Sequence, residues 1–304
     1  MRSFPELSYA NRNQPFAKRW FIRSVERLSG RDRYARLYDI WRTSIVPDGE
    51  AIFTRMLDLI DVRLDIVRPH LLAQVPAGPL VIVANHPFGI GDGIAALSLA
   101  ERLGRPFRVM INAELLKIRE MEPYSLSIDF SETKEALRSN MAMRHEALKL
   151  LREGVTIVVF PGGGVATARS AFGLAEDLPW KMFPARLIQE AKATVLPVHF
   201  AGQNGRLFHL VSRPMLAAEE GASVNPRLYN LSLTLRTSLL LREFARLSGR
   251  SIEARIGEPI VWDELAAIGD RRALTRFLQE RVVRMGDPVE ARPRLPRRLR
   301  AQAA

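Results

Sequence analysis

From residue 80 onward, short apolar runs rich in β-branched side chains alternate with longer stretches in which apolar positions have helical spacing. The runs are apolar enough to be buried on both faces of a sheet. They predict strands at 80–84, 107–111, 155–160 and 195–200, and the stretch 251–257 predicts one further strand. The stretches between and after them predict helices at 92–103, 132–153, 182–193, 228–247 and 270–285. This alternation predicts an α/β fold with a mostly parallel central sheet flanked by helices.

The first 75 residues mix aromatic and basic side chains and predict two helices, at 15–29 and 31–43. One apolar stripe of the first helix consists of Phe16, Trp20, Phe21, Val25 and Leu28, with arginines around it. Such a pattern is typical of a helix that lies in a membrane interface, with aromatic rings at headgroup depth and cations towards anionic lipid. A helix packed on the protein core with a solvated basic face would give the same pattern, so both interpretations stay open.

The chain has 304 residues, of which 47% are hydrophobic, so it can bury a sizeable core and is not disordered throughout. We expect an amphipathic helical segment over 1–75 at a membrane surface, an α/β domain over 76–288 and a basic disordered tail over 289–304. The absence of cysteine excludes disulfides, thiolate metal sites and a cysteine nucleophile. No apolar run reaches the roughly 18 residues that span a bilayer, and the first residues lack the apolar core of a secretory signal. We therefore expect a cytoplasmic protein, either free or attached to the membrane.

The formal net charge of +12 favours an anionic partner, which the sign alone does not identify. A phospholipid surface, a nucleic acid and an acidic carrier protein would all suit it.

One candidate for chemistry follows the predicted strand at 80–84. It begins with Asn85 and His86, continues through a glycine-rich turn and reaches Asp92 at the start of a predicted helix. A neutral imidazole can take a proton from a hydroxyl, while a carboxylate at its other nitrogen fixes the tautomer and stabilises the imidazolium. Gly89 and Gly91 allow the backbone to fold back so that the two side chains meet. The alternative is that Asp92 only caps the helix and His86 only ends the strand.

A second glycine-rich loop follows the predicted strand at 155–160 and contains Gly162, Gly163 and Gly164. Three consecutive glycines expose backbone N–H groups that can hold a phosphate or an oxyanion. Arg169 is the nearest cation and a candidate for binding a substrate phosphate, although a solvated surface arginine is equally compatible with its position. The loop is not a Walker loop, because no Gly-Lys-Ser/Thr follows. The chain also has no His-Glu-x-x-His metal motif and no Gly-x-Ser-x-Gly elbow.

The order of a strand, Asn-His-Pro-Phe-Gly, Asp-Gly, and a Phe-Pro-Gly loop about 75 residues later resembles the glycerolipid acyltransferase superfamily, which includes 1-acylglycerol-3-phosphate acyltransferases. Five residues between His86 and Asp92 make it similar to the branch of proteins often labelled hemolysins and of lyso-ornithine lipid acyltransferases. The similarity extends over about residues 70 to 260. The block from His86 to Asp92 is its most specific part.

The resemblance implies that 76–288 is an acyltransferase-type domain in which His86 is the general base and Asp92 its partner. It implies an acyl thioester of acyl-carrier protein or coenzyme A as co-substrate, a lysolipid hydroxyl as acceptor, and no further cofactor or metal. Asn85, the three glycines and Arg169 are the expected substrate-binding residues. The sequence departs from the family where Phe-Pro-Glu-Gly or Phe-Pro-Ala-Gly-Glu is usual, since only glycines stand at 162–164. The acceptor is then expected to be held by backbone amides and Arg169.

The sequence therefore predicts an O-acyltransferase that is peripheral on the inner face of the cell membrane and acylates a lysolipid such as lysophosphatidic acid or lyso-ornithine lipid. An anionic membrane is the expected surface partner, and nucleic acid is not expected. Two alternatives remain. One is a non-catalytic basic protein that docks on membranes or nucleic acid, and the other is a thioesterase-like hydrolase in which His86 activates water.

Overall fold

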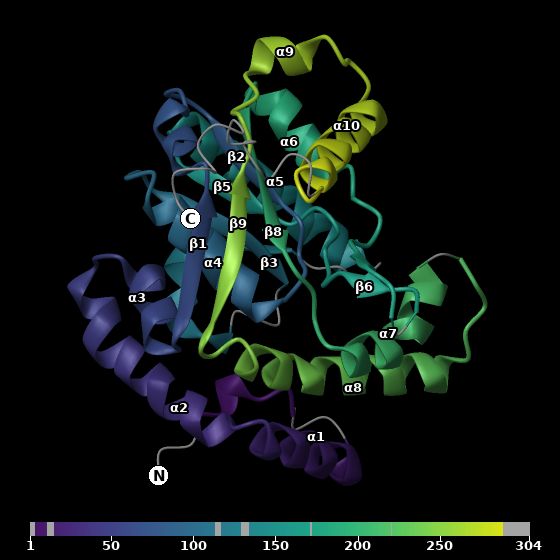
Figure 1. Ribbon diagram of the computed structural model, residues 1–304. Helices are drawn as coiled ribbons and strands as arrows, with labels where there is room; N and C mark the ends of the chain where they lie inside the picture. Colours follow the sequence, from purple (N-terminus) through teal and green to yellow (C-terminus); the bar gives the residue numbers. More distant parts are fainter. Residues whose placement is uncertain are drawn as a thin grey trace, which may run out of the picture.

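A computed structural model describes residues 4–10, 15–112, 117–128, 134–170, 172–219 and 221–287. Within these residues the chain is built around a seven-stranded sheet (Figure 1). In spatial order its strands are β1 (Val62–Val67), β9 (Arg250–Ile256), β8 (Thr194–Ala201), β2 (Leu80–Ala84), β5 (Thr156–Val159), β3 (Phe107–Asn112) and β4 (Ser125–Ile128). The strands from β8 to β4 are parallel to one another, and β9 and β1 run against them. The predicted α/β fold with a mostly parallel sheet is confirmed.

Strand β2 shows why a strand buried on both faces of the sheet is apolar at every position. Leu80, Ile82 and Ala84 belong to the core on one face of the sheet, while Val81 and Val83 belong to the core on the other. Each of these side chains is at most 1% exposed. A strand covered on both faces cannot alternate apolar with polar residues, so its sequence reads as a continuous apolar run.

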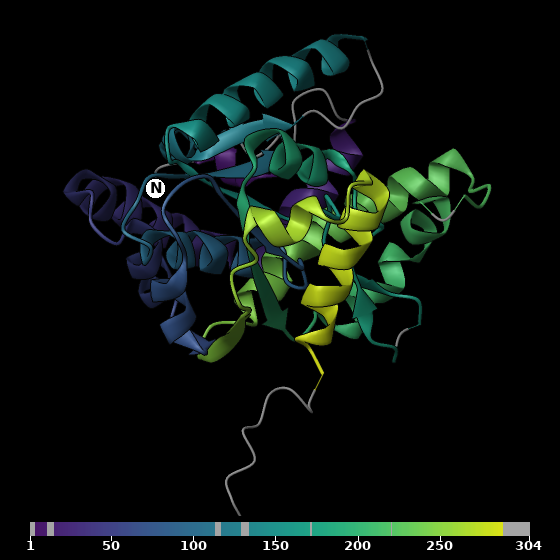
Figure 2. The same ribbon diagram turned by 90° about the horizontal axis from the view of Figure 1, so that it is seen from above.

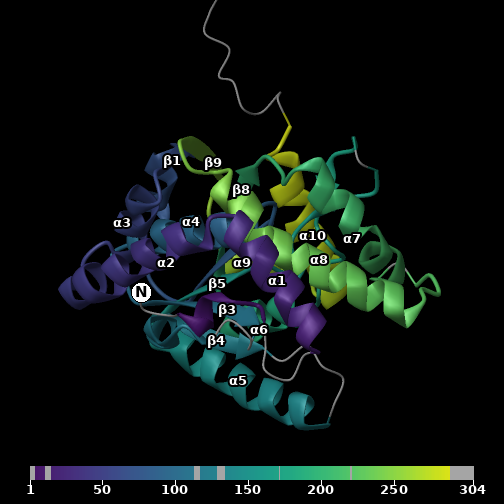
Figure 3. The same cartoon turned by 90° about the horizontal axis from the view of Figure 1, so that it is seen from below.

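Helices cover both faces of the sheet, and α6 lies between α5 and α10 on one of them (Figure 2). That face carries α5 (Lys134–Arg152), α6 (Phe183–Ala191), α9 (Trp262–Ala266) and α10 (Arg271–Arg284). The other face carries α2 (Arg31–Ile40), α3 (Ile52–Leu59) and α4 (Ile90–Glu101). The sheet edge where the parallel strands end is crossed by α8 (Pro226–Ala245), beside which lie α1 (Phe16–Leu28) and α7 (Arg206–Glu219) (Figures 1 and 3).

The elements that sequence reasoning missed are short or weakly patterned. Strand β4 has only four residues, helix α3 has eight, and α7 contains a proline in its interior. Strand β1 carries Arg63 and Asp65 among its apolar residues, because as an edge strand it is partly exposed. A two-stranded hairpin of β6 (Thr167–Ala168) and β7 (Ala175–Glu176) lies beyond the second glycine-rich loop.

The N-terminal segment divides between the core and the surface. Trp41, directly after α2, is fully buried in the core shared with the sheet, and its indole nitrogen donates to the carbonyl of Ile52 at 3.1 Å. On α1, by contrast, Phe16, Trp20 and Leu28 are 78%, 63% and 89% exposed. Over the described ranges, no helix combines the length and the apolar character that crossing a membrane requires. The predicted basic tail, 289–304, lies outside the described residues.

Candidate active site

The structure brings His86 and Asp92 together at the carboxyl end of β2, where ligands bind in open α/β sheets. The imidazole Nδ1 of His86 lies 3.1 Å from Oδ1 of Asp92. Asp92, in the first turn of α4, is fully buried, and its second oxygen accepts from the backbone N–H of Phe88 at 2.9 Å. Asp92 does not cap α4, because the residue before that helix is Gly89. The carboxylate is instead held inside the turn that joins it to His86.

The pKa of His86 reflects two opposing effects. Burial lowers the pKa of the imidazole, but the nearby charge of Asp92, with a smaller contribution from the charge of Asp177, outweighs burial and raises the pKa above its ordinary value. Arg236 opposes this slightly from a greater distance. A histidine held in this way is a stronger base than a free one, and its Nδ1 proton is directed to the carboxylate.

Gly89 permits the tight turn between the two side chains. Its φ is +84°, a region that other residues rarely adopt. A Cβ at this position would lie 3.0 Å from Val165 and 3.1 Å from Leu240 of α8. Glycine is therefore required here both by the backbone conformation and by the close approach of two other segments.

The second glycine-rich loop packs directly on the first. The Phe160 ring lies 4.3 Å from the His86 imidazole, centroid to centroid, at 30° between the planes. The N–H of Ala166 donates to the carbonyl of His86 at 2.7 Å. These contacts hold the imidazole, whose side chain is 18% exposed, between β2 and β5.

The remaining predicted site residues occupy different environments. The amide of Asn85 is engaged in two hydrogen bonds with the backbone of Phe200, at 2.9 and 2.7 Å, so it joins the loop to β8. Gly163 has a φ of +69° and donates its N–H to the carbonyl of Phe160 at 2.9 Å. A Cβ at Gly162 or Gly164 would meet Leu178 at 3.1 or 2.9 Å. Arg169 is 71% exposed and lies 4.0 Å from Glu176.

Sequence reasoning missed Asp177, a carboxylate directly beneath the site. One of its oxygens accepts from the backbone N–H of His86 at 3.0 Å, and the other accepts from the indole of Trp180 at 2.9 Å. Burial raises the pKa of Asp177, and these two hydrogen bonds oppose that shift. Asp177 stands 91 residues from His86, and no local pattern marked it.

Sequence reasoning also missed the role of Arg236, a 6% exposed arginine of α8. Its guanidinium donates to the hydroxyl of Thr167 at 2.7 Å and to the carbonyl of Val165, and it lies over the ring of Phe208. Arg236 thus holds the segment whose Ala166 N–H binds His86. The available signal was one arginine within 231–241, a stretch that otherwise holds only leucine, serine and threonine, since a buried arginine must find hydrogen-bond acceptors.

Comparison with protein families gives one broad match. The family model described as acyltransferase matches residues 7–291. The chain is 26% identical over 190 residues to the lyso-glycine lipid O-acyltransferase of Bacteroides thetaiotaomicron, covering 61% of this chain and 62% of that protein. It is 24% identical over 212 residues to the enzyme of the same name from Phocaeicola vulgatus, covering 68% and 67%. The aligned segments thus span about two thirds of these relatives or slightly less.

Among solved structures, the fold is similar to that of the 1-acyl-sn-glycerophosphate (LPA) acyltransferase PlsC from Thermotoga maritima. The TM-score is 0.50 at 17% sequence identity, over 90% of this chain and 93% of that one. At this identity the likeness extends to the fold only.

Proposed function

Because the chain belongs to the acyltransferase family, we propose that it is a lysolipid O-acyltransferase in which His86 is the general base and Asp92 its partner. The observation that carries this proposal is the 3.1 Å contact between Nδ1 of His86 and the fully buried carboxylate of Asp92. It leaves Nε2 as the nitrogen that can take a proton from a substrate hydroxyl.

In the proposed reaction, Nε2 of His86 removes the proton of a lysolipid hydroxyl as its oxygen attacks the carbonyl carbon of an acyl thioester. Asp92 stabilises the imidazolium that forms. The new ester C–O bond forms, the C–S bond breaks, and the imidazolium returns the proton to the leaving thiolate. The balance requires only an alcohol and a thioester, and it yields an ester and a thiol.

The tetrahedral intermediate carries negative charge on the former carbonyl oxygen, which backbone N–H groups can stabilise. We assign this role to the loop at 162–164, and acceptor binding to the same loop with Arg169. The N–H of Gly163 is already donated to Phe160, so Gly162 and Gly164 are the expected donors. Asn85, bonded to Phe200, would support binding by holding the loop in place.

The acceptor is proposed to be a lysolipid such as lyso-ornithine lipid or lysophosphatidic acid, and the donor an acyl-carrier protein or coenzyme A thioester. The two relatives are named for lyso-glycine lipid, and the solved structure is named for LPA. These names support a lysolipid as the acceptor.

We further propose that the protein works as a peripheral protein on the inner face of the cell membrane. Support comes from α1, where Phe16 and Trp20 stay exposed although Ile22 and Glu26 of the same helix are buried. Helix α1 lies beside α8, which crosses the site edge of the sheet (Figure 3). Aromatic side chains inserted here would place the lipid surface near His86. Replacing Phe16 and Trp20 by serine should reduce flotation with anionic vesicles, and unchanged flotation would contradict the assignment.

The purified full chain should transfer a labelled acyl group from a thioester to a lysolipid, measured as radioactive diacylated product. His86→Ala should reduce the rate by about 10²–10⁴, the usual contribution of a general base. His145→Ala, which removes an exposed histidine of α5, is the matched control. Equal rates for wild type and His86→Ala would contradict the assignment. Release of free fatty acid whether or not an acceptor is present would favour hydrolysis instead.

A further inference from the structure

A basic pocket of about 460 Å³ opens beside the active-site loop, between the start of α7, the end of α8 and the start of β9. Phe88, two residues after His86, and Leu247 form its apolar wall. The backbone N–H of the same Phe88 is bonded to Asp92. The pocket therefore shares a residue with the turn that carries the catalytic pair.

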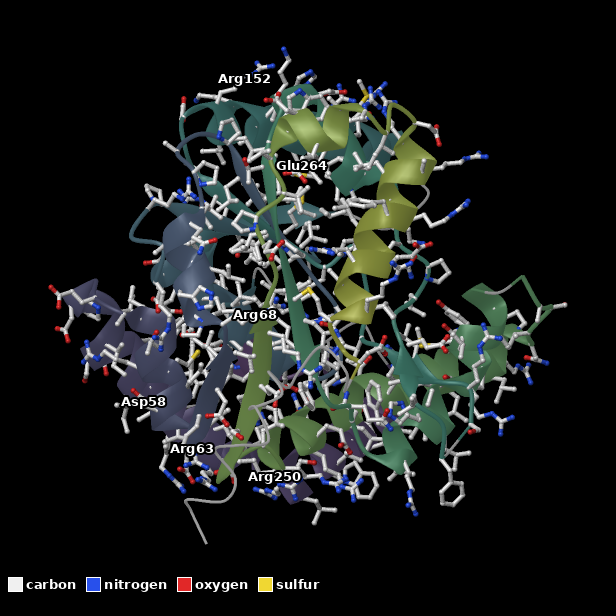
Figure 4. All side chains as sticks on the ribbon, turned by 45° about the horizontal axis from the view of Figure 1, so that its top comes forward. Asp58, Arg63, Arg68, Arg152, Arg250 and Glu264 are labelled. Carbon is white, nitrogen blue, oxygen red and sulfur yellow. The ribbon has the colours of Figure 1, made fainter. Side chains whose placement is uncertain are left out.

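Four arginines and one glutamate line this pocket. The arginines are Arg206, Arg242, Arg246 and Arg250. Figure 4 labels Arg250, which stands at the start of β9. Arginine presents several N–H donors in a planar fork that matches the oxygens of a phosphate, and it stays charged at any physiological pH. The lining thus carries an excess of positive charge with suitable donor geometry.

Glu243 organises two of these arginines and does not neutralise the whole group. This glutamate is 4% exposed, and its oxygens lie 3.9 Å from Nη1 of Arg242 and 3.5 Å from Nη1 of Arg246. One of its oxygens also accepts from the N–H of Gly205 at 2.7 Å. A Cβ at Gly205 would lie 2.3 Å from Nη1 of Arg246, so this guanidinium lies close to the backbone at the start of α7.

The start of α7 supplies further donors. Asn204, which lines the pocket, is 6% exposed, and its amide nitrogen has no hydrogen-bond partner among the described residues. Asn204 lies two residues before Arg206, the first residue of α7, where the first N–H groups have no partner within the helix and the dipole favours an anion.

We propose that this pocket binds a phosphate ester of a substrate, an inference that rests on the proposed acyl transfer. Two sources share this chemistry. The thioester donor carries phosphate esters in its phosphopantetheine arm or coenzyme A, and a lysophospholipid acceptor carries one in its headgroup. The negative end of the α8 dipole opposes an anion here, but it amounts to about half a charge. The arginines outweigh that opposing field.

The first test measures binding without turnover. Calorimetry with coenzyme A and with inorganic pyrophosphate would compare wild type, Arg242→Gln/Arg246→Gln and the control Arg272→Gln/Arg276→Gln, which removes two exposed arginines of α10. The pocket variant should bind both probes at least about tenfold more weakly, because charge-assisted hydrogen bonds are lost. The control should bind like wild type. Arg250→Gln, for which no ion pair is found among the described residues, repeats the test without disturbing Glu243.

The second test separates the two sources by steady-state kinetics. A raised KM for the acyl thioester alone would assign the pocket to the donor, and a raised KM for a lysophospholipid alone would assign it to the acceptor. Loss of probe binding in the pocket variants would support the pocket even if wild type transferred no acyl group, so the two proposals can fail separately. Equal binding by wild type and both pocket variants, or no binding of either probe to wild type, would overturn the pocket proposal.

Discussion

His86 and His199 stand near the ends of neighbouring parallel strands, yet their surroundings give their imidazoles opposite properties. At His86 a buried carboxylate lies 3.1 Å from Nδ1, and the pKa is raised. At His199 burial, followed by the charge of Arg255 directly opposite on β9, lowers the pKa to about 4. The backbone of Gly286 packs on this ring, since a Cβ there would lie 2.7 Å from it.

The contrast shows that burial without a carboxylate in contact makes a histidine a weak base that stays neutral. A carboxylate in contact with one ring nitrogen is what turns a buried histidine into a candidate general base. His209 supports the same conclusion. It is fully buried on α7, its Nδ1 accepts from the N–H of Ala168 at 3.2 Å, and burial lowers its pKa.

Removing the carboxylate beside His86 should abolish the difference in basicity between His86 and His199, and this is the largest effect we expect. Asp92→Asn should reduce acyl transfer by about 10²–10⁴, because the imidazolium loses its partner and the tautomer is no longer fixed. Asp270→Asn at the start of α10 is a matched control, since asparagine caps helices as well as aspartate does. Transfer rates at saturating substrate would measure the effect, and a wild-type rate for Asp92→Asn would contradict the role of Asp92.

His199 should instead affect the stability of the protein at low pH. Because its pKa is lower in the folded state than in the unfolded chain, the unfolded chain takes up a proton first as the pH falls. Titration of His199 should therefore leave the free energy of unfolding unchanged above the ordinary histidine pKa of about 6.5. It should lower that free energy by on the order of 3 kcal/mol as the pH falls to about 4. Urea unfolding of wild type and His199→Gln at pH 7 and pH 4.5 would measure this. The same pH dependence in both proteins would contradict it.

The pH dependence of acyl transfer should also distinguish His86 from His199. A general base must be neutral, so kcat/KM should fall as the pH drops through the pKa of His86, which lies above its ordinary value. His199→Gln should leave this limb unchanged. Any residual activity of Asp92→Asn should show the limb at lower pH, because burial then acts without the carboxylate. A limb at the same pH in Asp92→Asn and wild type would show that the limb belongs to another group.

The smallest effect should come from Asp177, which contacts the backbone of His86 and not its ring. Asp177→Asn should lower kcat by about tenfold or less, since an amide cannot accept both hydrogen bonds well and a typical hydrogen bond contributes a net ~0.5–1.5 kcal/mol. The acid limb should move slightly to lower pH, because the charge of Asp177 favours the protonated imidazole. Trp180→Phe, which removes the indole donor and leaves a smaller aromatic ring, should have a smaller effect on kcat. A loss as large as that of Asp92→Asn would assign Asp177 a direct role in the chemistry.

The local sequence was enough to predict much of the fold and one part of the site. The strands at β2, β3, β5 and β8 were predictable because both of their faces are covered, which makes most of their positions apolar. The loop from His86 to Asp92 was predictable for a similar reason. Its two functional groups are close in the chain, and glycine at 89 permits the turn that joins them.

Contacts between segments that are distant in the chain leave no local pattern in the sequence. Asp177 reaches His86 across 91 residues, and Arg236 reaches the carbonyl of Val165 across 71. Whether these side chains meet depends on where α8 crosses the sheet edge and how the hairpin of β6 and β7 folds back. Neither placement follows from the spacing of apolar residues within one element.

The amino-acid sequence by itself thus determined the order of buried strands and helices and the neighbouring base and carboxylate, because burial and short-range turns act on residues that are near in the chain. Only the tertiary structure decided which distant groups contact the His86 segment, which exposed rings of α1 stay uncovered, and which arginines gather beside Phe88. These outcomes depend on long-range packing, which places charges and donors from separate elements within a few ångströms of one another.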